Sequence, residues 1–263
     1  MMTVTAIPAL LDNYIWALVS EGGGAVIVDP GHADPVVRFL DQEHYHLDAI
    51  LLTHHHPDHI GGVEPLLGYL NARVPVYGPF TALGQVAIEP VHEGSRIVLP
   101  SGMTLTVMAV PGHTTDHVAY HGGGLLFPGD TLFSAGCGRQ FEGRMEDLFE
   151  SVQRLGALEP STRAYPAHEY TLANLAFASS LEPDNHLIAQ YRGQAQKQRM
   201  QNRATLPTTI GLEHDINPFL RTASAGIRTA AERHAGRPLR QPFEIFRELR
   251  LWKDHFTAQE ESR

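Results

Sequence analysis

Short apolar runs closed by turn signals dominate the first 170 residues of the chain. They occupy 14–19, 25–28, 49–52, 74–77, 96–99, 104–110, 119–120, 125–127 and 164–165. Short runs bounded by Gly, Pro, Asn and Asp favour β-strands. Helical spacing of apolar positions marks 59–70 and 145–155 in the same region. The pattern therefore predicts a mixed α/β domain.

The pattern changes near residue 171, where apolar positions take up a helical spacing. Helices are predicted over 172–180, 185–202, 223–234 and 242–256, with a Pro- and Gly-marked connection at 207–211. We therefore expect two domains. A mixed α/β domain over residues 1–172 is followed by a smaller all-helical domain over residues 173–263.

Charge and composition narrow the class of protein. The chain carries a net charge of −9; residues 1–100 hold 3 Lys or Arg against 11 Asp or Glu, whereas residues 171–263 hold 13 against 10. Such an acidic chain is unsuited to general nucleic-acid binding, so an anion-binding surface is expected in the basic tail. No apolar run approaches the ~20 residues that a membrane helix needs. We expect neither a nucleic-acid partner nor a membrane partner.

Two further features indicate the compartment. Met1–Val4 lack the basic stretch of a secretory signal, so we expect no such signal. The only cysteine is Cys137, which leaves no disulfide within the chain. A cytoplasmic location is expected.

Residues 53–59 read Thr-His-His-His-Pro-Asp-His and directly follow the apolar run 49–52. Imidazole and carboxylate are ligands that zinc, iron and manganese accept. In an extended chain His54 and His56 point to one side, so His55 points away. Asp58 and His59 follow from a helix start at Pro57, and one loop can therefore serve two metal ions. A histidine-rich surface loop is the competing interpretation, but it would need neither the strand before nor the helix after.

Three later segments repeat the order of strand, proline and ligand-type residue. They are Pro111-Gly-His113, Pro128-Gly-Asp130 and Pro166-Ala-His168. Each one alone is more typical of a turn with a polar residue. Because all of them, like the histidine-rich loop, follow predicted strands, we expect them at one edge of a sheet, where loops carry chemistry on a rigid scaffold.

This set of residues resembles that of the metallo-β-lactamase superfamily, which implies an αββα sandwich with its ligands on loops at one sheet edge. Further motifs resemble the glyoxalase II, or hydroxyacylglutathione hydrolase, family over nearly the whole chain. They are Cys137-Gly-Arg-Gln-Phe-Glu-Gly143, His168-Glu-Tyr170, Asn217-Pro-Phe-Leu-Arg221 and Arg250-x-x-Lys253-Asp254. The resemblance implies hydrolysis of an S-(2-hydroxyacyl)glutathione thioester, S-D-lactoylglutathione, to glutathione and D-lactate. This reaction is the second step of methylglyoxal detoxification.

The resemblance also implies a site for two divalent ions. One would be held by His54, His56 and His113, the other by Asp58, His59 and His168, with Asp130 as the bridge. Zinc is the expected metal, and iron and manganese also fit His and Asp ligands. The expected nucleophile is a bridging hydroxide, so Asp58 and Asp130 are the expected catalytic residues. His117 and His121 are not expected as ligands, and Asp29 either orients a ligand or caps a turn.

For the substrate, the resemblance implies a glutathione pocket formed by Arg139, Phe141, Tyr170, Arg250 and Lys253. The two carboxylates of glutathione need cations and directional donors. Arg250 and Lys253 share one face of a predicted helix, which without the resemblance would be read as a solvated face. The chain departs from the family pattern at Arg139, where lysine is common, and at Phe141, where tyrosine is common.

Other functions compete with the thioesterase. An iron-dependent glutathione persulfide dioxygenase of the same superfamily would need one metal ion and would lack the long helical tail. A superfamily nuclease is disfavoured by the acidic charge, and a metal-storage protein by ligands drawn from distant segments. A Cys137 thiol nucleophile is disfavoured because an activated water leaves it no role. We expect a monomer that acts on a small-molecule glutathione thioester.

Overall fold

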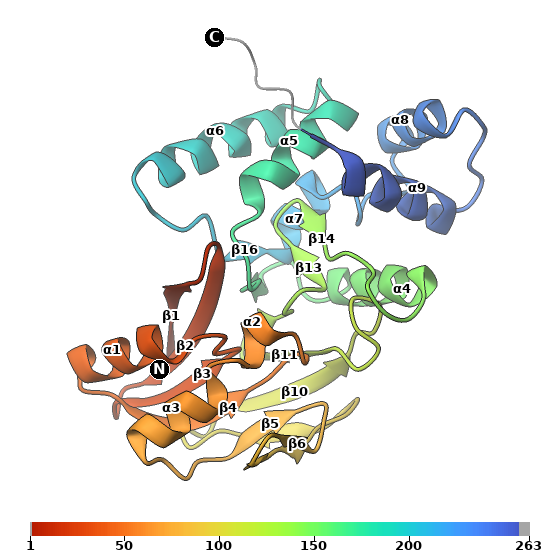
Figure 1. Cartoon of the computed structure of the whole chain (residues 1–263). Coiled ribbons are helices and arrows are strands. Elements are labelled where there is room, and N and C mark those ends of the chain that lie inside the picture. The colour runs from red at the N-terminus through yellow and green to blue at the C-terminus, as the bar shows by residue number, and fades with distance from the viewer. Residues whose placement is uncertain (1, 258–263) are drawn as a thin grey trace.

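The computed structural model describes residues 2–257. Two six-stranded β-sheets pack face to face and carry helices on their outer faces (Figure 1). The first sheet contains, in spatial order, β1 (Met2–Ala9), β2 (Asn13–Ser20), β3 (Gly24–Val28), β4 (His46–Leu51), β5 (Val76–Gly78) and β8 (Glu89–Pro90). β3, β4, β5 and β8 are parallel, whereas β1 and β2 are antiparallel neighbours. The predicted αββα sandwich is confirmed.

The second sheet is largely antiparallel. In spatial order it contains β16 (Thr208–Thr209), β15 (Arg163–Ala164), β12 (Leu125–Phe127), β11 (Val118–Gly122), β10 (Thr104–Ala109) and β9 (Arg96–Val98). Two short hairpins lie outside the sheets: β6 (Ala82–Leu83) with β7 (Val86–Ala87), and β13 (Leu132–Phe133) with β14 (Gly136–Cys137).

β2 shows how the sequence builds the two sides of the first sheet. Its residues are buried on both faces because alternate side chains enter different cores. Tyr14, Trp16 and Leu18 pack between the two sheets, in a cluster that also contains Tyr120. Ile15 belongs to the cluster under the helices of the first sheet. An apolar run without alternation is therefore the expected pattern for this strand.

The first sheet is covered by α1 (Ala33–Glu43) and α3 (Val63–Leu70), which share its outer core. The helix predicted over 59–70 is interrupted, because α2 (Pro57–Ile60) and α3 are separated by Gly61 and Gly62. A Cβ atom on Gly62 would collide with the backbone of Pro30 and His32. Glycine at this point lets the histidine-rich loop pack against the end of β3.

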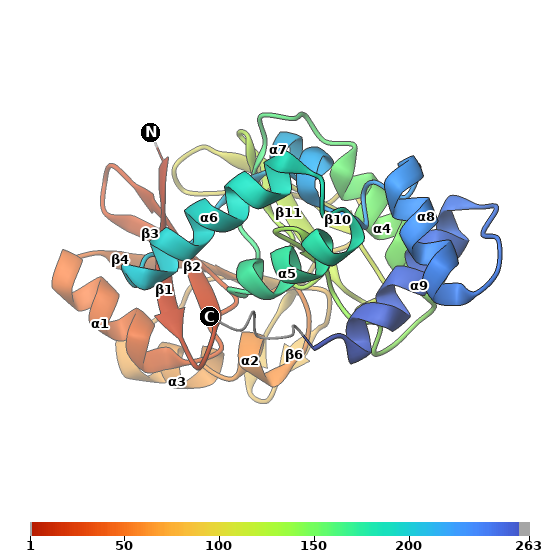
Figure 2. The same ribbon diagram turned by 90° about the horizontal axis from the view of Figure 1, so that it is seen from above.

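The C-terminal region lies across one end of the sandwich (Figures 1 and 2). Its helices are α5 (Thr171–Leu181), α6 (His186–Met200), α7 (Ile210–Ile216), α8 (Ala225–Ala235) and α9 (Pro242–His255). α5, α7, α8 and α9 share one hydrophobic core with α4 (Met145–Gly156) and the second sheet, whereas α6 packs in a smaller cluster with α5 and α7. One short strand, β16, leaves the helical region and pairs with β15. Among the described residues, no helix has the length and apolar character needed to cross a membrane.

Candidate metal centre

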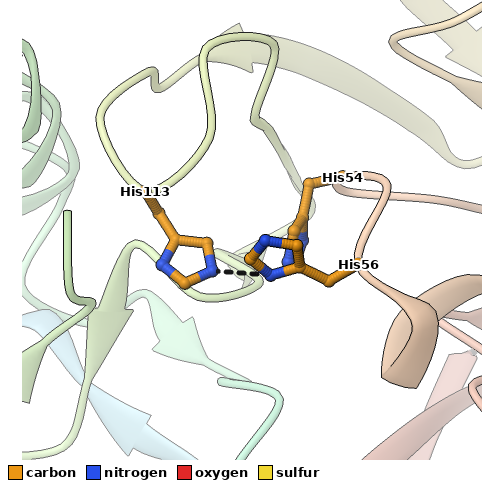
Figure 3. A group of neighbouring side chains, drawn as sticks. All are labelled: His54, His56 and His113. Carbon is orange, nitrogen blue, oxygen red and sulfur yellow. Dashed lines mark hydrogen bonds between the residues drawn. The ribbon is translucent and has the colours of Figure 1, made fainter. Parts of the chain in front are cut away.

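The strand ends at one edge of the sandwich bring the seven predicted ligands together. They form three groups whose ligand atoms lie within 4.8 Å of one another: His54, His56 and His113; His54, His59 and Asp130; and Asp58, His59 and His168. The first group joins the loop after β4 to the loop after β10, and its three rings converge in Figure 3. The expected meeting of loops at one sheet edge is thus what the fold produces.

The histidine-rich loop is shaped by its transition from strand to helix. His56 has an extended backbone, and Pro57 begins α2, so Asp58 lies in the first helical turn. Gly31, at the end of β3, lies against this turn, and a Cβ atom there would collide with the Asp58 carbonyl. The close approach brings the end of β3 next to the loop, where Asp29 reaches His59.

Asp130 lies between the two outer groups. Its Oδ1 is 3.5 Å from His59 Nε2 and 3.4 Å from His168 Nε2. Its Oδ2 is 3.5 Å from His113 Nε2. One carboxylate oxygen therefore faces each side of the centre, as a bridging ligand requires. On the Oδ2 side, His113 Nε2 and His56 Nδ1 face each other at 3.1 Å (Figure 3).

Hydrogen bonds behind four imidazoles fix which nitrogen faces the centre. The Nδ1 atoms lie at 3.0 Å from Thr53 Oγ1 for His54, 3.0 Å from Asp29 Oδ2 for His59, 2.9 Å from the Arg139 carbonyl for His113, and 2.8 Å from Asp12 Oδ1 for His168. Each ring consequently presents Nε2 to the centre. Such outer partners orient metal-binding histidines and raise their basicity.

Unpartnered buried atoms show that these residues suit a cation. His54 Nε2, His59 Nε2 and Asp130 Oδ1 are buried and have no hydrogen-bond partner among the described residues. A buried polar atom without a partner costs roughly 1–3 kcal/mol. A divalent ion accepts lone pairs from imidazole and carboxylate together, which removes this cost. The cluster is therefore a His and Asp site for divalent metal ions.

The electrostatics of the cluster point the same way. Burial by itself would lower the pKa of His59, but Asp130 and Asp29 raise it to about 10. Burial would also lower the pKa of His168, but Asp130 raises it to about 11. Burial would raise the pKa of Asp58, yet the neighbouring imidazoles of His168 and His59, each with Nε2 at 3.4 Å from Oδ2, hold it well below its usual range. The carboxylates thus favour positive charge beside them, and either protons or metal ions can supply it.

The histidines not expected as ligands lie outside the three groups. His55 contacts Asp116 and Glu142 at 3.2 Å each, so its side chain points away as predicted. His117 is buried: it stacks on His54 with ring centroids 4.6 Å apart and accepts a hydrogen bond from the Asp130 backbone N–H at 3.1 Å. His121 lies on β11.

The structure resolves the role of Asp29 and adds a residue that the sequence did not reveal. Asp29 Oδ1 accepts from the Thr53 backbone N–H, and Oδ2 contacts both the Thr53 hydroxyl and His59, so this carboxylate orients the loop rather than capping a turn. Asn13 donates to Asp58 Oδ2 at 3.0 Å. It lies at the start of β2, 45 residues from Asp58, and no sequence pattern links the two.

A cavity of about 440 Å³ opens beside the centre. Its lining includes His113 and Asp130 together with all five predicted substrate residues: Arg139, Phe141, Tyr170, Arg250 and Lys253. The Tyr170 ring stacks on His168 at 4.7 Å, and the Phe141 ring meets His113 edge-on at 5.2 Å. The fold thus places the predicted substrate residues next to the predicted metal ligands.

Arg250 and Lys253, two cations of this cavity, have different surroundings. Arg250 is buried, and its guanidinium donates to the Cys137 carbonyl at 2.8 Å and to Asp254 at 3.0 Å. Its hydrogen bonds therefore hold the cavity wall. Burial, with the charges of Arg250 and Arg139, lowers the pKa of Lys253 to about 8. Burial raises the pKa of the Cys137 thiol to about 11, which leaves it unsuited as a nucleophile.

Comparison with known proteins identifies the family. Residues 11–168 match the model of the metallo-beta-lactamase superfamily, and residues 169–256 match that of the hydroxyacylglutathione hydrolase C-terminus. The hydroxyacylglutathione hydrolase of Aeromonas hydrophila is 47% identical over 97% of this chain and all of its own length. That of Xanthomonas campestris is 47% identical over 98% of this chain and all of its own length. This chain belongs to the hydroxyacylglutathione hydrolase family.

Two solved structures share the fold of this chain. ETHE1 from Myxococcus xanthus has 23% identity and a TM-score of 0.64, covering 95% of this chain and 89% of that one, which shows a shared fold alone. The di-iron-bound form of TTHA1623 has 26% identity and a TM-score of 0.60, covering 83% of this chain and all of that one. The C-terminal match of the hydroxyacylglutathione hydrolase family contains Tyr170, Arg250 and Lys253, which line the cavity.

Proposed function

We propose that this chain hydrolyses the thioester of S-(2-hydroxyacyl)glutathione, with S-D-lactoylglutathione as the substrate and glutathione and D-lactate as the products. One observation carries the proposal: the cavity that contains Arg139 and Lys253 opens directly onto His113 and Asp130. The cations suit the carboxylates of glutathione, and the His and Asp cluster suits a hydrolytic metal site. The family relatives bear the name of this activity.

Two metal ions per chain, zinc by preference, are part of the proposal. The support is that the oxygens of Asp130 face opposite groups of ligands, and that TTHA1623 was solved with two irons. When bound, such ions supply Lewis acidity and lower the pKa of a water molecule toward neutrality. His54, His56 and His113 would hold one ion; Asp58, His59 and His168 would hold the other.

The protein groups hold the reactants in place. Asn13 fixes Asp58 through its Oδ2, and the low pKa of Asp58 makes this carboxylate a ligand rather than a strong base. Phe141 and Tyr170 flank the centre and orient the glutathionyl part of the substrate. The departing thiolate has a conjugate acid with a pKa of about 8.5, so it leaves near neutral pH without a dedicated general acid.

The same proposal covers the setting of the reaction. We infer a monomer that works in the cytoplasm, without nucleic acid as a partner. The single cysteine supports the cytoplasmic location, and the net charge of −9 argues against nucleic acid.

The test combines metal analysis with a substrate comparison. The purified chain should contain about two divalent ions and hydrolyse S-D-lactoylglutathione far faster than a glutathione-free lactoyl thioester. Asp130→Asn is the matched control, because it removes the carboxylate and keeps the size of the side chain. Equal rates on both thioesters would contradict the glutathione pocket, and oxygen consumption with glutathione persulfide would instead support the dioxygenase.

A further inference from the structure

Two buried polar residues, one in α7 and one directly after it, have no part in the reaction described above. Glu213 and Asn217 are fully buried, and neither lines the cavity beside the metal centre. Asn217 begins the Asn-Pro-Phe-Leu-Arg motif at residues 217–221. Burial of a carboxylate and an amide costs several kcal/mol unless their hydrogen bonds are satisfied, so their partners indicate what they do.

Their partners are the backbone atoms at the tip of the β13–β14 hairpin. Glu213 Oε2 accepts from the Ala135 backbone N–H at 2.7 Å. The Asn217 side-chain amide donates to the carbonyls of Phe133 at 3.2 Å and Gly136 at 2.9 Å, and also to Glu213 Oε2 at 3.0 Å. Ala135 has φ of 55°, a left-handed conformation that is unfavourable for alanine. The two side chains thus stabilise a strained turn.

The other end of this hairpin is part of the metal centre. Asp130 precedes β13 by two residues, and the Gly138 backbone N–H donates to the Thr131 carbonyl at 3.2 Å. A Cβ atom on Gly138 would collide with the Asp130 carbonyl, so the two ends of the hairpin pack directly on each other. The next carbonyl, that of Arg139, accepts from His113 Nδ1 at 2.9 Å. The hairpin therefore joins Asp130 to the group that orients His113.

We propose that Glu213, together with Asn217, is a positioning residue that fixes the β13–β14 hairpin and thereby sets Asp130 and His113 for metal binding and catalysis. This inference rests on the proposed hydrolase function for its kinetic part. Phe133 and Cys137 of the hairpin also line the cavity, so movement of the hairpin changes the substrate wall as well. The C-terminal region then serves the metal centre from behind, in addition to lining the cavity.

A matched pair of substitutions separates hydrogen bonding from packing. Glu213 Oε1 accepts from the Thr208 hydroxyl at 2.6 Å. Glutamine can keep a carbonyl oxygen toward Ala135 and turn its NH₂ toward Thr208, whose hydroxyl rotates to accept. Methionine has a similar length but no oxygen, so Glu213→Met removes the contact to Ala135. Ile227→Ala on α8 is the control for general loss of stability, because Ile227 is buried but offers the hairpin no hydrogen bond.

The experiment measures four quantities on the metal-loaded chain: kcat and KM for S-D-lactoylglutathione, the rate of metal loss to a chelator, the free energy of unfolding, and hydrogen exchange at the Ala135 amide. Glu213→Met should lower kcat and speed metal loss by about 10-fold, the lower end of the range for groups that hydrogen-bond a ligand directly, because Glu213 acts on Asp130 and His113 through the hairpin. Its Ala135 amide should exchange faster. Glu213→Gln should stay within about threefold of the wild type, since its hydrogen bonds persist.

Asn217→Ala is judged by the same measurements if Glu213→Met does not fold. Wild-type kcat and metal retention in a folded Glu213→Met or Asn217→Ala chain would overturn the proposal. So would an equal loss of kcat in Ile227→Ala at the same free energy of unfolding. If the wild-type chain does not hydrolyse the thioester, the hydrolase function fails, whereas metal loss and Ala135 exchange still decide the positioning role.

Discussion

Asp29 holds the imidazole of His59 from behind, with its Oδ2 at 3.0 Å from Nδ1. The same carboxylate accepts from the backbone N–H and the hydroxyl of Thr53, so it binds both ends of the histidine-rich loop. Both side chains are buried. His59 is thereby fixed with Nε2 directed at the cluster before any metal binds.

Asp29→Asn should therefore weaken metal binding. The amide cannot accept at both positions, so either Thr53 or His59 loses its partner. We expect metal affinity to fall by about 10- to 100-fold. A competition titration with a chromophoric chelator measures this, and Asp34→Asn, an exposed acid on α1, serves as the control. Equal affinities in both variants would show that Asp29 does not orient His59.

Asp130→Ala should abolish both metal loading and turnover. Asp130 contributes an oxygen to each side of the cluster, so its loss should affect both of the proposed ions. We expect less than about 1% of wild-type kcat, a greater loss than outer partners cause. Metal content per chain and kcat are measured on the same preparation. Wild-type turnover with a single ion bound would disprove the bridging role.

Phe141→Tyr should lower the KM for S-D-lactoylglutathione. Phe141 lies at the cavity mouth, 62% exposed, with its ring against His56 and His113. A tyrosine hydroxyl adds one donor for the ligand, worth about 0.5–1.5 kcal/mol, or a few-fold to tenfold in affinity. Phe141→Leu is the control for ring packing. An unchanged or higher KM in the tyrosine variant would place residue 141 outside the glutathione site.

The affinity for substrate should fall as pH rises through about 8. Burial and two neighbouring arginines lower the pKa of Lys253 to about 8, so the amine is charged below this pH and neutral above it. Only the charged form attracts a substrate carboxylate. The profile of kcat/KM, which reports the free enzyme, should therefore decline above pH 8. Lys253→Met should remove this decline. If kcat/KM of the variant still declined above pH 8, the decline would belong to another group.

Cys137→Ala should retain turnover. The thiol is buried, its pKa is raised to about 11 and it lies 3.8 Å from Arg250 Nη1. A nucleophile would need the thiolate at neutral pH. We expect kcat within about threefold of the wild type, because truncation of a small buried side chain removes packing only. Loss of kcat in a variant with wild-type metal content would revive the thiol mechanism.

Most strands and helices follow from the local pattern, and the exceptions have physical causes. α1 (Ala33–Glu43) was not predicted, although its buried Val36, Val37 and Leu40 follow helical spacing, because this short apolar set lies between strand-like runs. β1 was missed because it is an edge strand containing Pro8. β16 consists of two residues, which are a strand because they pair with β15.

The sequence by itself determined the composition of the centre. His54, His56, Asp58 and His59 crowd one loop, and the later ligand-type residues follow proline at strand ends, so local chemistry and strand order suffice to predict a metal site. The substrate residues came from motifs, and the fold then brought them to one cavity beside the cluster.

Only the tertiary structure decided what holds that centre in place. Asn13 reaches Asp58 across 45 residues, and Glu213 reaches Ala135 across 78. These contacts are hydrogen bonds between distant segments. They produce no periodicity or motif in the sequence, because any residue with a suitable donor or acceptor can make such a bond. A ligand set can be predicted from its own chemistry, whereas the contacts that orient it depend on how the whole chain packs.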